Sequence, residues 1–135
     1  MRKPICCCCV AVLFAGCIES DREEARYEGV PTSIWVLRMR DEDVAVRQEA
    51  ARALGVLGPS ELEETLTPLL EALQDPDPMV RYHALVSIGK LRPPARKASV
   101  AVGRAINDKD KRVVKAAIQV YRQLEVSRPS SLNAN

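Results

Sequence analysis

The sequence of 135 residues predicts an all-α fold, a short α-solenoid of three helical-hairpin repeats, from three observations. An Asp-rich turn recurs at a shift of 34 residues and again after 33 more, at Asp41 to Arg47, Asp75 to Arg81 and Asp108 to Val114. Apolar residues after each turn have the spacing of one helix face. Only 4% of residues are aromatic although 47% are hydrophobic, which favours small helices packed closely. A single repeat cannot bury its own apolar faces, so the three are expected to stack.

The chain begins with the pattern of an export signal. Arg2 and Lys3 precede an apolar run from Ile5 to Gly16, and Cys17 closes the run. A helix of this length would rise about 18 Å, whereas the hydrocarbon of a bilayer is roughly 30 Å thick. Residues 1–17 are therefore predicted to be a targeting signal and not a transmembrane span.

The end of this signal resembles the lipobox of bacterial lipoproteins, in the residues Leu13-Phe14-Ala15-Gly16-Cys17. Phe14 departs from the family, in which an aliphatic residue is commonest at that place. The resemblance implies that Cys17 is lipidated and anchors the protein in the bacterial cell envelope, and Ile18, which is not the Asp of inner-membrane retention, favours the outer membrane. An ordinary export signal giving a secreted or periplasmic protein, and a cytoplasmic protein with an apolar tail, are the alternatives.

The rest of the chain divides into a tether, three repeats and a tail. Residues 18–30 are acidic and are expected to form a tether or a short helix, and residues 127–135 are rich in Ser and Asn and are expected to be disordered. The repeats span about 31–59, 60–93 and 94–126.

Each repeat is expected to contain two helices, of which the second has an apolar stripe with steps of 4, 1, 3 and 3 residues. The stripes are Val46, Ala50, Ala51, Leu54 and Leu57; Val80, Ala84, Leu85, Ile88 and Leu91; and Val113, Ala117, Ile118, Tyr121 and Leu124. The first helices are marked by apolar pairs four residues apart, Trp35 and Met39, Leu69 and Leu73, and Val102 and Ile106. Thr67 and Pro68 are predicted to begin the first helix of the second repeat, as N-cap and first helical residue.

The pattern Asp-x-Asp-x-x-Val-Arg followed by Ala-x-x-Leu/Ile-Gly-x-Leu, at Asp41 to Leu57 and Asp75 to Leu91, resembles HEAT repeats of the short, phycobilisome-lyase-like subtype. Tetratricopeptide repeats share the 34-residue period, but their Trp-x-x-Leu-Gly-x-x-Tyr signature is absent from this sequence. The resemblance covers about residues 31–125 and implies that turn Asp and Arg side chains pair between neighbouring repeats. The implied ladder is Arg47 with Asp75 or Asp77, and Arg81 with Asp108 or Asp110. Val114 replaces the Arg in the third copy, which indicates that the stack ends there.

Residues for catalysis or metal binding are few. His83 is the only histidine, whereas a zinc site needs about three or four protein ligands. Cys6 to Cys9 are adjacent, so they cannot all reach one tetrahedral centre, and they suit the apolar part of a signal. No catalytic residue, metal site or cofactor is predicted.

Charge is distributed unevenly along the chain. Residues 17–77 contain 15 acidic and 6 basic side chains, and residues 79–135 contain 3 acidic and 12 basic ones. Because sequence order is spatial order in a solenoid, one end is expected to be acidic and the other basic. The basic end is predicted at Lys109, Lys111, Arg112 and Lys115. This end is either a solvated terminal face without a partner, or it binds an acidic protein, envelope phosphate groups or the acidic end of a second copy. Nucleic acid is not expected for an exported protein.

The function predicted from these features is a non-catalytic scaffold for protein-protein interaction, tethered to the membrane through Cys17. A groove along the second helices is expected to hold the partner through polar positions outside the core, namely Gln48, Arg52, His83, Ser87, Lys115 and Gln119. Two alternatives stay open. One is an enzyme or enzyme subunit related to HEAT-like chromophore lyases, and the other is a remnant or fragment of a longer HEAT-repeat protein.

Overall fold

The structure, a computed structural model, describes residues 25–92 and 95–126. The predictions for the signal at 1–17, for Cys17 and for the tail at 127–135 lie outside the described residues. Most of the predicted tether at 18–30 lies outside them as well.

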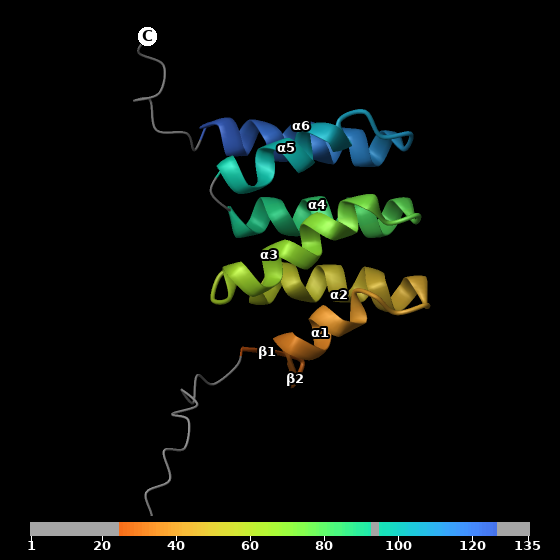
Figure 1. Ribbon diagram of the computed structural model, residues 1–135, viewed down its shortest axis with the longest axis vertical. Helices are drawn as coiled ribbons and strands as arrows, with labels where there is room; N and C mark the ends of the chain where they lie inside the picture. Colours follow the sequence, from red (N-terminus) through yellow and green to blue (C-terminus); the bar gives the residue numbers. More distant parts are fainter. Residues whose placement is uncertain (1–24, 93–94, 127–135) are drawn as a thin grey trace, which may run out of the picture.

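Helical hairpins stack side by side in two layers (Figure 1). One layer holds the first helix of each repeat, and the other holds the second helices, with α4 between α2 and α6. The first helices are α1 (Thr32–Arg38), α3 (Leu62–Glu71), which runs into the 3₁₀ helix η1 (Ala72–Gln74), and α5 (Ala95–Ala105). The second helices are α2 (Val44–Leu57), α4 (Pro78–Leu91) and α6 (Lys111–Val126). The predicted all-α solenoid of three hairpins is confirmed.

Small residues let the second helices approach each other closely. Ala50, Ala84 and Ala117 occupy the same place in α2, α4 and α6, and each is fully buried. The predicted stripes form much of the core, together with first-helix residues such as Trp35 and Leu69. Three stripe residues are only half-buried, namely Val46, Ile118 and Tyr121. They lie on the first and last of the second helices, each of which has only one such neighbour among the described residues.

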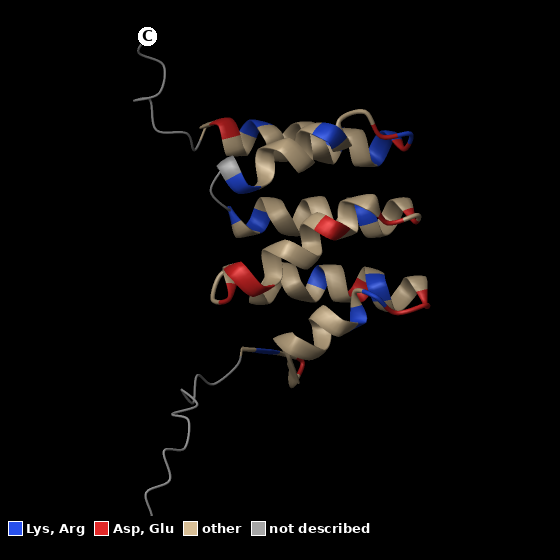
Figure 2. Ribbon diagram, viewed as in Figure 1, with Lys and Arg blue, Asp and Glu red and all other residues tan. Residues whose placement is uncertain are grey.

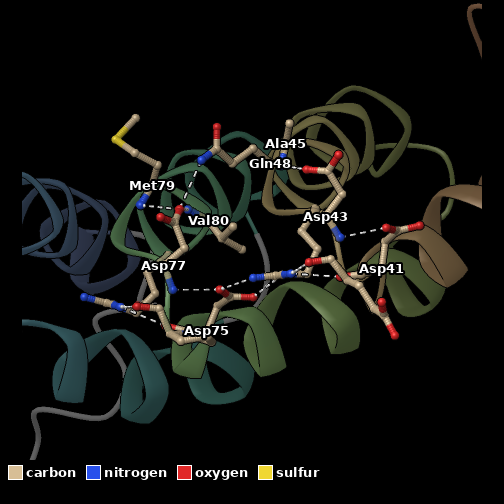
Figure 3. Close-up of polar contacts among 12 residues, drawn as sticks. Asp41, Asp43, Ala45, Gln48, Asp75, Asp77, Met79 and Val80 are labelled. Carbon is tan, nitrogen blue, oxygen red and sulfur yellow. Dashed lines mark hydrogen bonds and ion pairs between the residues drawn. The ribbon is translucent and has the colours of Figure 1, made fainter.

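The Asp-x-Asp turns begin the second helices by the same hydrogen bonds in all three repeats. The first Asp of each turn accepts from the main-chain N–H of the second, at 2.9 Å in the first two repeats and 2.8 Å in the third. The second Asp then caps the helix through its Oδ1, as Figure 3 shows for the first two repeats. The capped main-chain donors are Ala45 N at 2.8 Å, Met79 N at 3.0 Å and Arg112 N at 2.8 Å. These carboxylates are therefore part of the fold.

The predicted start of α3 at Thr67 and Pro68 is wrong. The helix begins at Leu62, so Pro68 lies inside it and removes one main-chain donor. Thr65 and Leu66, both ahead of the proline, are buried against the core. Burial of this turn keeps it helical because tertiary packing outweighs the lost hydrogen bond.

Residues 25–31 form a β-hairpin, so the short helix considered for 18–30 is wrong for this part. β1 (Arg26–Tyr27) pairs antiparallel with β2 (Val30–Pro31). Glu28 and Gly29 between them have φ angles of 51° and 77°, as a two-residue hairpin turn requires and a helix forbids. The ring of Tyr27 packs edge-on against that of Trp35, with 5.9 Å between centroids, so the hairpin covers the N-terminal end of the core.

Candidate functional site

Arg47 connects the first turn to the second. Its Nε and Nη2 donate to the two carboxylate oxygens of Asp75, at 2.8 and 3.1 Å. Its Nη1 donates to the main-chain carbonyls of Asp41 and Glu42 in its own turn, at 2.8 and 3.0 Å. A planar guanidinium suits this bidentate geometry.

Arg81 repeats the arrangement one unit further on. It donates to the two Asp108 oxygens at 2.7 and 2.8 Å, and to the carbonyls of Asp75 and Pro76 at 2.7 and 3.1 Å. The structure thus brings each arginine to the first Asp of the next turn, while the second Asp, at 77 or 110, caps its helix. Val114 occupies the equivalent place in α6 and has no side-chain donor, so this ladder of two rungs ends there.

The electrostatics of the turns fit a structural role. Burial raises the pKa of Asp77, but hydrogen bonds from Val80 N and the Gln48 amide outweigh it, and the pKa lies below its ordinary value. The Arg81 guanidinium lowers the pKa of Asp108. The Arg112 side chain lowers the pKa of Asp110 to about 2. These groups therefore stay ionised in the folded protein at neutral pH.

The lowered pKa values predict that the protein loses stability in acid. The unfolded chain binds protons at a higher pH than these folded carboxylates, so their stabilising contribution is present above about pH 4 and is lost as the pH falls toward about 2. Urea unfolding followed by circular dichroism should show the free energy of unfolding falling over this range. Asp108→Asn should flatten the profile, whereas Glu42→Gln, whose side chain joins none of these bonds, should leave it unchanged. Parallel profiles for wild type and Asp108→Asn would contradict the assignment.

The polar residues predicted for the groove differ in their availability. Arg52 is exposed and pairs with Glu49 on the same helix. His83, on the neighbouring helix α4, is half-buried, and its ring packs edge-on against Tyr82 with 5.4 Å between centroids. Burial and then the charge of Arg52 lower the pKa of His83, so the imidazole is neutral at pH 7. Gln48 is half-buried and donates to Asp77 at 3.1 Å.

Ser87 does not line a groove, and this prediction is corrected. Only 1% of the residue is exposed, and its hydroxyl donates to the carbonyl of Ala51 at 2.7 Å. Gly55 on α2 leaves room for the side chain, because a Cβ there would lie 2.3 Å from Ser87 Oγ. Ser87 therefore joins α2 to α4 and is not accessible to a partner.

The C-terminal repeat presents the predicted basic residues to solvent. Lys109, Lys111, Arg112 and Lys115 are all exposed, as is Gln119 further along α6. Arg112 pairs with Asp110 in its own turn at 2.8 Å. In Figure 2, Lys and Arg appear in blue at this end of α6, whereas acidic and basic residues lie together in the first two repeats.

The sequence analysis missed one surface feature, a groove between the C-terminal halves of α4 and α6. Two adjoining hollows there share Gly89, Arg92 and Gln123 in their walls. A signal for it was present in the repeat alignment, because Val120 stands where the second repeat has Ser87. A larger residue at this contact predicts looser packing of the two helices.

The described residues offer no cluster of three or more His, Cys, Asp or Glu side chains that could hold a metal ion. No helix in the same part of the chain is long and apolar enough to cross a membrane.

Stacked hairpins joined by an Arg-Asp ladder define an α-solenoid repeat protein. The family model described as HEAT repeats matches residues 31–122, which is most of the chain, and the protein belongs to this family. HEAT repeats generally mediate protein-protein interaction, and such scaffolds are typically non-catalytic. A search of curated proteins gave no match.

Proposed function

We propose that the protein is a non-catalytic scaffold that holds a protein partner on the exposed face of α2, α4 and α6 and is anchored to the bacterial cell envelope through a lipid on Cys17. One observation carries the first part of this proposal. The opposite side of the second helices packs on the first helices, and the turn carboxylates are used by the ladder and the caps. The outer face of the second helices therefore has side chains that neither the core nor the ladder uses and that a partner can contact.

The residues available on this face come from all three second helices. Arg52, Lys115 and Gln119 are exposed, and the neutral ring of His83 on α4 is half-buried. They combine two cations, an amide and an imidazole, a set that suits hydrogen bonding and ion pairing to a protein surface.

A photo-crosslinking amino acid in place of Gln119, in the bacterium that makes the protein, tests the surface. We expect one discrete crosslinked protein, and none from the same group in place of Arg104, which is exposed on α5 in the other layer. The crosslink should disappear when Arg52→Glu, His83→Ala and Lys115→Glu are combined. Unchanged crosslinking in that triple variant would remove the surface from consideration.

The anchor is proposed from the lipobox-like sequence ahead of Cys17. Metabolic labelling with a radioactive fatty acid should label the wild-type protein and Cys9→Ala but not Cys17→Ala. An unlabelled wild-type protein would exclude the lipid anchor and leave the second-helix surface to be tested separately.

A further inference from the structure

The groove between α4 and α6 is a second feature of the exposed second-helix face. It extends over the C-terminal halves of both helices, through the two adjoining hollows that share Gly89, Arg92 and Gln123. Val120 and Leu124 lie buried beneath it, and Val126, which is 86% exposed, adds accessible apolar surface at one end.

A difference between two helix contacts explains why the groove is here. Between α2 and α4, Ser87 fits against Gly55 and seals the contact through its bond to Ala51. Between α4 and α6 the equivalent residues are Val120 and Gly89, and the valine has no hydroxyl and more bulk. A Cβ on Gly89 would lie 3.1 Å from Val120 Cγ2, compared with 2.3 Å from Ser87 Oγ for one on Gly55. The looser contact leaves room along the helix ends.

The charged side chains among the described residues of the groove are all basic. Lys90, Arg92 and Arg122 line it, and the residues that the structure describes in its walls include no carboxylate. None of these three cations forms an ion pair within the described part of the chain. Arg52, by contrast, pairs with Glu49 on its own helix, and Arg112 pairs with Asp110 in the turn before α6. Among the residues that the structure describes, the groove therefore carries positive charge without a paired carboxylate, beside the exposed apolar side chain of Val126.

Arg92 adds a second observation. It follows the last residue of α4 with φ 45° and ψ 52°, the left-handed conformation that glycine adopts most easily. Arg92 thus places a long cationic side chain at a position where glycine would be less strained. Strain of this kind occurs often at binding sites.

We propose that this groove binds an extended acidic segment of a partner protein, in which carboxylates flank an aliphatic side chain. Arg92 and Arg122 pair with the carboxylates through their planar guanidinium groups. The aliphatic side chain packs on the exposed side chain of Val126, which a free phosphate would not use. The exposed Gln119 amide can both donate to and accept from a peptide group. This inference rests on the proposed function and names the chemistry of its partner.

The test measures binding of a fluorescent nine-residue peptide of alternating Glu and Leu to the full-length protein in detergent micelles, by fluorescence anisotropy. We expect saturable binding below about 1 mM that weakens with added salt. The matching Gln-Leu peptide should bind at least about tenfold more weakly. Arg92→Gly combined with Arg122→Gln should weaken binding by a similar factor, whereas Arg104→Gln, which removes the same charge from the other layer, should not. Arg92→Gly relieves the left-handed strain, so its melting temperature should not fall.

Three results would overturn the proposal. They are the absence of binding at this concentration, equal binding of the Glu and Gln peptides, and displacement of the peptide by inorganic phosphate or by anionic lipid vesicles at equal anion concentration. The last result would show a general anion site. Peptide binding without a crosslinked partner at position 119 would support the groove proposal and contradict the proposed function. A crosslinked partner without peptide binding would contradict only the groove proposal.

Discussion

Gly55→Ala is expected to lower the free energy of unfolding by about 3 kcal/mol, although alanine is the better helix former. The added Cβ would lie 2.7 Å from Ser87 Cβ and 3.0 Å from Ser87 Cα, so the α4 backbone itself would have to move. That movement would also stretch the 2.7 Å bond from Ser87 to Ala51 and leave buried polar atoms unpaired. Urea unfolding of the purified full-length protein would measure the change.

Gly103→Ala is the matched control for this prediction. Gly103 also lies inside a helix, α5, and the nearest atom to its added Cβ would be 3.5 Å away, an ordinary van der Waals distance. The control should therefore gain about 0.5–1 kcal/mol from helix propensity alone. Two variants with the same sign of effect would show that α2 and α4 do not meet as described.

Arg81→Met is expected to lower the free energy of unfolding by about 3 kcal/mol, since it leaves the half-buried Asp108 carboxylate without its bidentate partner. The side chains of the pair are only 15% and 12% exposed, so water compensates poorly for the loss. The carbonyls of Asp75 and Pro76 lose a donor as well.

The double variant Arg81→Met with Asp108→Asn should recover part of this loss, because the amide carries no charge yet keeps an oxygen for Asp110 N. Arg40→Met is the control. Arg40 pairs with Glu71 at 3.3 Å, but their side chains are 80% and 57% exposed, so urea unfolding should show almost no change. Equal losses in Arg81→Met and Arg40→Met would contradict a structural ladder.

Much of the fold could be predicted from the sequence, because the same apolar pattern, which marks one face of a helix, occurs in three copies. The 4, 1, 3, 3 spacing was read correctly as a helix stripe, and the buried alanines at 50, 84 and 117 accounted for the shortage of aromatic residues. The residues of the candidate site were harder to predict from the sequence. Arg52, Lys115 and Gln119 lie off the stripe and are exposed, as expected. Ser87 also lies off the stripe, but it is buried.

The sequence by itself determined the hairpins and their number, and its resemblance to HEAT repeats implied the pairing of the ladder to within two aspartates per turn. Tertiary structure decided the rest: which Asp receives the Arg, why Ser87 is buried, why the turn before Pro68 stays helical, and where the groove opens. The physical reason is that periodicity reports which side of one helix is apolar. The partner of a polar group, and the space left between two helices, depend on atoms that a neighbouring element brings from far along the chain.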